Sequence, residues 1–355
     1  MSLQDKLQEE FSDYYVQNCT KTCFNISVRL GKTRIGILIM QKLKVEKVLI
    51  LYPLEDIKKG WEEEFEKMNY KPEIVYSTYL SVNKNLSSYD LIIADEIQKA
   101  STRALVNIDA LLEINNRFLG LSGTYSLNTK KELKEICNLE ISKEYNTEQA
   151  IENKIVANYE VIIKQYSLDA TKQYLKQLKT KNYYTTETKD LKTYNNRILN
   201  SFGESQKFAR INRMQWINKC NSLKENTLKL INELKDKRFL LYGADTNFVD
   251  SLGIPTFHNK NKLNNNLELF KNETINQLGL VQFASQGVTF KNLDTIIITN
   301  INSNSENLFQ KLARSLLLDS DNISKIYIIT SDEEFQIKWL MSALADVPNN
   351  KIKYA

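Results

Sequence analysis

The sequence predicts an α/β protein of two lobes, each with a parallel sheet, joined by a mainly helical linker or insertion. Short apolar runs alternate with amphipathic helical patterns in the first third of the chain, and the same alternation returns in the last third. Strands that alternate with helices at this spacing form parallel sheets. The length of 355 residues suits two domains of about 150 residues each.

The first lobe is expected within residues 1–145. Its candidate strands are short runs rich in branched and aromatic side chains, at 23–28, 47–52, 73–77, 89–94 and 117–121. Helical patterns lie between them, at 33–43, 54–68 and 101–114.

The second lobe is expected within residues 231–355. Its candidate strands lie at 238–242, 255–258, 278–283, 295–299 and 325–330, and its candidate helices at 247–252, 304–317 and 332–344. The intervening residues, 146–230, form long polar stretches with helical character and few strands. We interpret them as the linker or insertion.

The composition excludes several classes of protein. One histidine, His258, and four cysteines without a Cys-x-x-Cys pair cannot form a zinc finger or a histidine-rich metal site. Four scattered cysteines form no disulfide framework, so we expect a reducing compartment, the cytoplasm. The apolar runs are far shorter than the roughly 20 residues that cross a bilayer, and no apolar segment opens the chain. We therefore expect neither a membrane span nor a signal peptide.

The tripeptide Gly31-Lys32-Thr33 leads from the first predicted strand into an apolar helix. A tight turn at a helix N-terminus presents N–H groups to phosphates, a lysine reaches the β and γ oxygens, and a hydroxyl ligates Mg²⁺. The sequence therefore predicts a site for phosphates and Mg²⁺. The complete phosphate-loop pattern requires glycine where Ile26 stands, so an ordinary loop with these residues is the alternative.

An acidic pair, Asp95 and Glu96, follows the predicted strand at 89–94. Ligands of parallel sheets bind at the carboxyl ends of strands. We expect this pair and the phosphate loop to lie on adjacent strand ends, with Asp95 holding Mg²⁺ and Glu96 polarising the attacking water. A solvated acidic pair at a strand end is the alternative.

Further motifs follow in order. The first lobe carries Arg29 and Leu30 before GKT (31–33), then VLILYPLEDIKKGWEEEF (48–65), VYSTYLSV (75–82), ADEIQ (94–98) and LSGT (121–124); the second carries RFLLYGAD (238–245), FASQGVTFKNLDTIII (283–298) and NLFQKLARSLL (307–317). The ordered set resembles motifs I to VI of the superfamily-2 helicases and translocases. Their DEAH and remodeller-like members have two RecA-like lobes, and this chain resembles a compact, phage-type member.

The resemblance implies ATP and Mg²⁺ between the lobes and a nucleic acid across both. We favour DNA over RNA and expect a monomer. It implies catalytic roles for Lys32, Asp95, Glu96, Gln310 and Arg314; ATP contacts from Arg29, Gly31, Lys32, Thr33, Arg34, Gln98 and Gly287; and Mg²⁺ ligation by Thr33 and Asp95. It implies nucleic-acid contacts from Pro53, Thr78, Tyr79 and Thr289, and coupling of the two sites by Ser122 and Thr124.

The last motif departs from the family pattern. Ala313 stands where glycine is usual, and Leu317 stands where the second arginine belongs. Arginine is a bidentate ligand of phosphate, and leucine cannot replace it. We expect ATP hydrolysis that depends on Lys32 and Glu96. The alternatives are a degenerate, nucleotide-dependent clamp and an unrelated phosphate-loop ATPase.

The basic excess of the chain is confined to one segment. Residues 166–224 contain 12 Lys and Arg against 4 Asp and Glu, whereas the remainder has 36 against 39. Aromatic side chains are interleaved with these cations, and Lys207, Arg210 and Arg213 share a helix face. Such a pattern favours a phosphate backbone with bases to stack on. A helical spacer with solvated lysines and inward aromatics is the alternative.

Three single residues have open interpretations. Gln8 and Gln17 are both candidates for a glutamine that reads adenine. We interpret Trp61 as the aromatic anchor of a helix, and His258 as structural.

Overall fold

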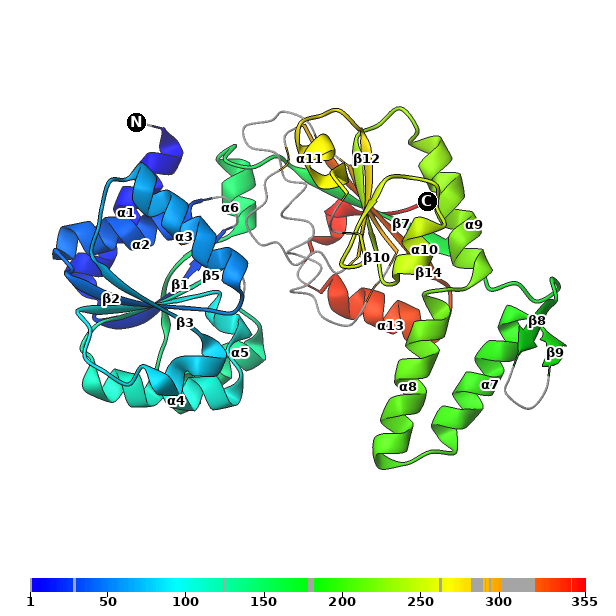
Figure 1. Cartoon of the computed structure of the whole chain (residues 1–355), viewed down its shortest axis with the longest axis horizontal. Coiled ribbons are helices and arrows are strands. Elements are labelled where there is room, and N and C mark those ends of the chain that lie inside the picture. Colours follow the sequence, from blue (N-terminus) through cyan, green and yellow to red (C-terminus); the bar gives the residue numbers. More distant parts are fainter. Residues whose placement is uncertain are drawn as a thin grey trace. The chain divides into compact units, whose positions relative to one another are not determined.

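The computed structural model describes residues 2–27, 30–123, 125–177, 182–261, 264–281, 323–345 and 347–355, together with 290, 292–293, 295–299 and 301 (Figure 1). The chain divides into two compact units. The first lobe ends at Ala157 and the second begins at Asn158. Among the described residues, no helix combines the length and the apolar character that a bilayer crossing needs.

The first lobe is a six-stranded sheet with helices on both faces. The strands run in the order β3-β2-β4-β5-β1-β6, and every pairing is parallel. Their bounds are Lys21–Ile26 (β1), Lys47–Tyr52 (β2), Glu73–Thr78 (β3), Leu91–Asp95 (β4), Phe118–Ser122 (β5) and Ile141–Tyr145 (β6).

The helices of this lobe divide between the two faces of the sheet. Helices α1 to α3 lie on one face, and α4 and α5 lie on the other (Figure 1). Their bounds are Leu3–Asn18 (α1), Lys32–Leu43 (α2), Glu55–Lys67 (α3), Thr102–Ile114 (α4), Leu127–Cys137 (α5) and Thr147–Glu152 (α6), with short 3₁₀ turns at Tyr79–Lys84 (η1) and Ile97–Lys99 (η2). The sheet is therefore buried on both sides, as its nearly continuous apolar strands require.

The order of strands corrects one expectation. Strand β5 lies between β1 and β4, so the phosphate loop and the acidic pair do not follow adjacent strands. All these strands are parallel, so their carboxyl ends still lie along one edge. The register places Asp95 beside Leu121 and Ser122 beside Asn25. The end of β5 thus separates the two halves of the predicted site.

The second lobe contains a seven-stranded parallel sheet in the order β11-β12-β10-β13-β14-β7-β15. Its strands are Tyr159–Tyr166 (β7), Phe239–Gly243 (β10), Thr256–Phe257 (β11), Gln277–Val281 (β12), Thr295–Ile298 (β13), Ser324–Ser331 (β14) and Ile352–Tyr354 (β15). Its helices include Asn221–Glu233 (α9), Thr246–Asp250 (α10), Asn266–Lys271 (α11) and Glu334–Ala343 (α13), with a 3₁₀ turn at Asn349–Lys351 (η3). The helix expected at 304–317 lies outside the described residues.

Strand β7 lies within residues 146–230, where the sequence predicts few strands. It pairs with β14 over eight residues and with β15 on its other side, so it belongs to the second sheet. Its alternating burial and its aromatic and β-branched residues are typical of a strand. Apart from the short helix α6, the helices of the segment begin at Glu187.

An arm follows β7. A two-stranded antiparallel hairpin, Tyr174–Gln177 (β8) and Asn182–Thr185 (β9), leads into two helices, Glu187–Leu199 (α7) and Gly203–Ile217 (α8). These helices lie side by side as a helical hairpin (Figure 1). Apolar residues near its base, such as Leu191 and Ile217, join the core of the second lobe.

Candidate active site

The phosphate loop has a conformation that only glycine adopts readily. Gly31 has φ 91° and precedes helix α2, whose first residue is Lys32. A Cβ atom at Gly31 would be strained by this backbone conformation, and it would also lie 2.5 Å from Nε2 of Gln8, which would have to move. The first N–H groups of α2, including that of Thr33, are therefore presented at the end of the loop.

Gln8 of helix α1 holds this loop from the side. Its side chain is only 3% exposed, and Nε2 donates a hydrogen bond of 2.7 Å to the backbone oxygen of Leu30. Its Oε1 atom is buried and has no hydrogen-bond partner among the described residues. Gln17, on the same helix, is exposed. Of the two candidate glutamines, Gln8 is therefore the one beside the phosphate loop.

Lys32 reaches across the end of β5 to the acidic pair. Its Nζ atom forms an ion pair with Oε1 of Glu96. Burial opposes the charge of Lys32, but the nearby carboxylates of Glu96 and Asp95 outweigh burial and raise the pKa of Lys32. Burial likewise opposes the charge of Glu96, but Lys32 and a hydrogen bond from Gln98 prevail and lower the pKa of Glu96. The two residues thus hold each other in the charged state.

Asp95 ends strand β4 and is buried. Its Oδ2 accepts a hydrogen bond of 2.9 Å from Nε1 of Trp61, and its Oδ1 accepts one of 2.9 Å from the backbone N–H of Glu96. Burial raises the pKa of Asp95 to about 6, against the opposing effect of Lys32. Hydrogen bonds therefore fix the direction of both carboxylate oxygens. The Asp95 side chain changes its protonation state close to neutral pH.

Trp61 has a role that the sequence analysis missed. It is an anchor, as predicted, because it lies on α3 and is fully buried. It also donates the hydrogen bond that orients Asp95. A Cβ atom at Gly36 of α2 would lie 2.6 Å from the Trp61 ring, so a glycine in the neighbouring helix makes room for the indole. The spacing of Trp61 from a glycine and an aspartate on other elements carries no local sequence signal.

Glu96 adopts a strained backbone conformation. Its φ is 51° and its ψ is 47°, in the left-handed region that non-glycine residues seldom occupy. Nε2 of Gln98 donates a hydrogen bond of 2.5 Å to Oε2 of Glu96, while Lys32 binds the other oxygen. Strain of this kind persists where the surroundings over-determine it, and it concentrates at functional sites.

The structure corrects the expectation for Tyr79. This side chain is buried at the start of η1, and its hydroxyl donates a hydrogen bond of 2.7 Å to the backbone oxygen of Asp95. It supports the acidic pair and presents no surface to a nucleic acid. Thr78 is the last residue of β3, and Pro53 comes directly after β2; both are partly exposed. They lie at the carboxyl edge of the first sheet, where the acidic pair also lies.

The donor set is chemically suited to a magnesium nucleotide. It combines a lysine, a hydroxyl and two carboxylates at the carboxyl edge of a parallel sheet, beside a helix N-terminus. Mg²⁺ favours oxygen ligands and takes few from the protein, since phosphates and waters supply the rest. The described part of the chain has no group of three or more His, Cys, Asp or Glu that could hold a metal.

Comparison with known proteins identifies the fold. No protein-family model and no curated protein matches the chain. Dbp5 of S. cerevisiae, bound to RNA and ADP BeF3, matches 99% of this chain over 89% of its own length, with a TM-score of 0.61 and 9% identity. A DEAD box protein from the hyperthermophile Methanococcus jannaschii matches 98% of this chain over 92% of its own length, with a TM-score of 0.51 and 13% identity. The chain has the two-lobed, RecA-like fold of the superfamily-2 helicases.

One further structure that is similar to this chain is much longer. The ATP-dependent Type ISP restriction-modification enzyme LlaBIII, bound to DNA, matches 100% of this chain with a TM-score of 0.61 and 12% identity. The match covers 31% of LlaBIII. The whole chain is therefore similar to about a third of that enzyme.

Several predicted site residues of the helicase fold lie outside the described residues: Arg29, Thr124, Gly287, Thr289, Gln310 and Arg314. Ser122 is described and buried at the end of β5, between the phosphate loop and the acidic pair. Arg34 is exposed on α2, where its Nη2 lies 3.8 Å from Oδ1 of Asp5. It therefore points toward α1.

The basic triad of the arm divides into two kinds of residue. Lys207 and Arg210 are exposed on α8. Arg213 instead donates a hydrogen bond of 2.8 Å from Nη1 to Asn195 of α7, and its guanidinium carbon lies 3.8 Å from the centre of the Phe335 ring. Burial lowers the pKa of Arg213. This corrects the expectation of a shared phosphate-binding face, because Arg213 joins the arm to α13.

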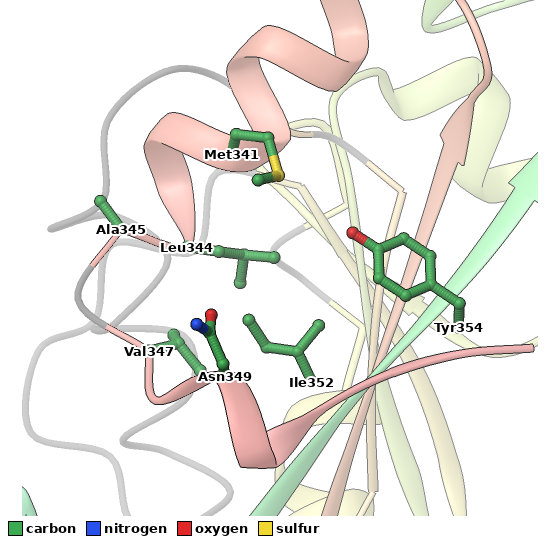
Figure 2. Close-up of a pocket in the computed structure, with 7 residues that line it drawn as sticks. All are labelled: Met341, Leu344, Ala345, Val347, Asn349, Ile352 and Tyr354. Atoms are coloured by element: carbon green, nitrogen blue, oxygen red, sulfur yellow. The ribbon is translucent and has the colours of Figure 1, made fainter.

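The second lobe also contains an apolar pocket (Figure 2). Met341 and Leu344 of α13 face Ile352 and Tyr354 of β15 across it. Asn349 and the Tyr354 hydroxyl are the polar groups among the described residues of its lining. We assign no chemistry to it.

Proposed function

We propose that this chain is an ATP-dependent nucleic-acid helicase or translocase, in which hydrolysis drives movement along a strand. One observation carries the proposal: Lys32, Asp95 and Glu96 meet at the carboxyl edge of the first sheet, beside the N-terminus of α2. A cation that can hold phosphates, a carboxylate for Mg²⁺ and a second carboxylate for water are the parts that phosphoryl transfer needs.

The surroundings of this cluster fit a purine nucleotide. The buried and unpartnered Oε1 of Gln8 is an acceptor that an exocyclic amino group, such as that of adenine, would satisfy. Thr33 and Asp95 are the oxygen ligands that the chain offers to Mg²⁺. When bound, Mg²⁺ neutralises charge on the phosphate oxygens. The second lobe would contribute Gln310 and Arg314, the latter as the cation that stabilises the departing phosphoryl group.

Glu96 is proposed as the base that positions water. Its negative charge is stabilised by the ion pair with Lys32. Phosphates would attract the Lys32 ammonium and weaken this ion pair. Burial would then act on Glu96 with less compensation and raise its pKa, which makes a carboxylate a better base. Binding of the nucleotide would thus activate the group that hydrolysis requires.

DNA is the substrate that we propose, and a monomer is the form that we propose acts on it. The neighbours with this fold include proteins bound to RNA and one bound to DNA. The choice of DNA therefore rests on the sequence motifs that resemble the remodeller-like branch.

The decisive experiment measures ATP turnover with single-stranded DNA, duplex DNA and RNA. We expect stimulation by DNA, and a loss of at least about a hundredfold in Lys32→Ala and in Glu96→Gln. Gln17→Ala, an exposed change on α1, is the control. Wild-type protein that hydrolyses no ATP with any of the three nucleic acids would overturn the proposal.

A nucleotide-dependent clamp is the second candidate. It is favoured by Leu317, which stands where the family pattern has its second arginine. A clamp would bind DNA more tightly with ATP than without it and would release no phosphate. A helicase would release phosphate and displace a strand.

A further inference from the structure

The helical hairpin of the arm ends in exposed apolar side chains. Phe202, the residue before α8, is 82% exposed, and Leu199, the last residue of α7, is 73% exposed. Phe208, in the second turn of α8, is 61% exposed. Large apolar side chains gathered at one protruding end mark a surface that contacts another molecule. We call Leu199, Phe202 and Phe208 the apolar tip.

The far end of the same hairpin is anchored. Leu191 and Ile217 are buried in the core of the second lobe, and Arg213 packs on Phe335 of α13. The buried carboxylate of Glu187 accepts a hydrogen bond of 3.0 Å from the backbone N–H of Ser222, at the start of α9. The hairpin is thus fixed at its base and presents its turn to the outside (Figure 1).

The turn itself is braced by its own polar groups. Nε2 of Gln206 on α8 donates a hydrogen bond of 3.1 Å to the backbone oxygen of Ile198 on α7. The Ser201 hydroxyl donates to the oxygen of Arg197 at 2.6 Å, and the Ser205 hydroxyl donates to that of Phe202 at 2.8 Å. A braced turn displays Phe202 in a set direction, so little conformational entropy is lost on contact.

The charge around the apolar tip identifies the kind of partner. All residues of 187–217 are described, and their exposed ionisable side chains are five basic and one acidic: Lys189, Lys192, Arg197, Lys207 and Arg210 against Glu204. Lys189, Lys192 and Leu199 follow one face of α7 by three- and seven-residue steps, and Arg210 and Lys207 lead along α8 toward the turn. Two basic rows that lead to an apolar end match two phosphate backbones that flank stacked bases.

We propose that the apolar tip is a wedge that packs against the last base pair of a nucleic-acid duplex and separates its strands. The basic rows would hold the two backbones while Phe202 and Leu199 replace the stacking that the opened bases lose. This inference rests on the proposed function for the energy that drives strand separation, although the contact itself requires no ATP.

The first test removes the apolar side chains. Phe202→Ala combined with Leu199→Ala should lower the rate of strand displacement on a forked duplex about tenfold or more. Turnover of ATP without nucleic acid should stay within about twofold of wild type, because these residues belong to the arm of the second lobe and not to the phosphate loop. Phe202→Trp, which keeps a ring for stacking, should retain displacement.

Leu127→Ala is the matched control, since it removes an exposed leucine, 88% exposed, at the start of α5 in the first lobe. It should displace strands as the wild type does. The wedge is overturned if the double variant displaces strands at the wild-type rate. It is also overturned if Phe202→Trp is as defective as the alanine change.

A second test separates the wedge from the proposed function. A forked duplex with 2-aminopurine in its last base pair is mixed with protein in the absence of ATP. Wild type should raise the fluorescence by unstacking the base, and the double variant should not. This result would stand even if no ATP were hydrolysed. Equal fluorescence with both proteins would contradict the wedge and would leave a protein partner as the occupant of the tip.

Discussion

At the scale of single residues, the hydrogen bond from Trp61 to Asp95 orients a carboxylate of the candidate active site. A carboxylate that is proposed to bind Mg²⁺ needs a fixed direction, and both oxygens of Asp95 accept hydrogen bonds from the protein. Groups that orient a metal ligand from behind affect metal binding almost as strongly as the ligand itself. The indole is therefore part of the site, although it would touch neither the nucleotide nor the metal.

Trp61→Phe should weaken Mg²⁺ binding while the core stays nearly filled. The change keeps a ring and removes the donor, which leaves a buried carboxylate oxygen with one bond fewer. We expect an unfolding free energy lower by about 1–3 kcal/mol and a Mg²⁺ requirement for ATP turnover that rises about tenfold. Turnover is measured against Mg²⁺ concentration, and stability is measured by urea unfolding.

Trp339→Phe, at an aromatic contact in α13 of the second lobe, is the control. It should leave the Mg²⁺ requirement at its wild-type value. If Trp61→Phe lost stability but kept the wild-type Mg²⁺ requirement, the indole would be only a packing residue.

The raised pKa of Asp95 predicts a specific dependence of stability on pH. Its value is about 6 in the folded protein, against 3.8 for the free side chain, so the folded state binds the proton more tightly. Wild-type stability should therefore fall as pH rises from about 4 to about 6, relative to Asp95→Asn, which cannot ionise. The difference should grow by up to about 3 kcal/mol and then remain constant.

Urea unfolding of both proteins without Mg²⁺, across this pH range, measures that difference. Asparagine cannot accept all the hydrogen bonds that Asp95 accepts, which changes the unfolding free energy by an amount that is independent of pH. The test is therefore how the difference in unfolding free energy between the two proteins changes with pH. A difference that stays constant from pH 4 to pH 7 would show that Asp95 titrates as it does in the unfolded chain.

At the scale of elements, the sequence predicts most of the fold, because apolar strands and amphipathic helices carry their periodicity locally. The predicted strands at 47–52 and 73–77 agree with β2 and β3 to within one residue. The order of strands is not local, which is why β5 was not expected between β1 and β4. Strand β7 was missed because its polar neighbours resemble a linker, and its partner β14 lies far along the chain.

The candidate site also contains residues that the sequence identifies and residues that only the structure reveals. Lys32, Thr33, Asp95 and Glu96 belong to short motifs with characteristic residue types, so sequence alone could single them out. Trp61 and Tyr79 support Asp95 from two other elements, and their polar contacts arise only when α3 and η1 pack against β4. Sequence motifs therefore identify the candidate catalytic and binding residues, but they do not identify the residues that orient them.

Helix α1 offers a paired test of the nucleotide site. Gln8 is buried against the phosphate loop, and Gln17 is exposed on the same helix. Gln8→Ala should raise the KM for ATP about tenfold and abolish any preference for ATP over GTP, because it removes both the loop contact and the free acceptor. Gln17→Ala should change neither quantity. Equal effects of the two changes would mean that Gln8 has no part in reading the base.

At the scale of the whole molecule, the formal charge of +5 is an average of unlike parts. Residues outside 166–224 are slightly acidic in sum, so attraction to a polyanion depends on the arm. In the structure, not every cation of the basic triad is available to a polyanion. Arg213 is engaged with Asn195 and Phe335, whereas Lys207 and Arg210 remain at the surface.

This division predicts that the triad separates into two phenotypes. Lys207→Ala with Arg210→Ala should weaken DNA binding. It should also make the slope of log affinity against log salt shallower by roughly 1 to 2, since each phosphate contact that is lost means about one counterion fewer released on binding. Arg213→Ala should instead lower the melting temperature, because it removes a hydrogen bond and a ring contact that join the arm to α13. Affinity is titrated at several salt concentrations, well below the melting temperature of every variant. If Arg213→Ala reduced the salt slope as much as the double change, the guanidinium would reach a phosphate despite its packing on Phe335.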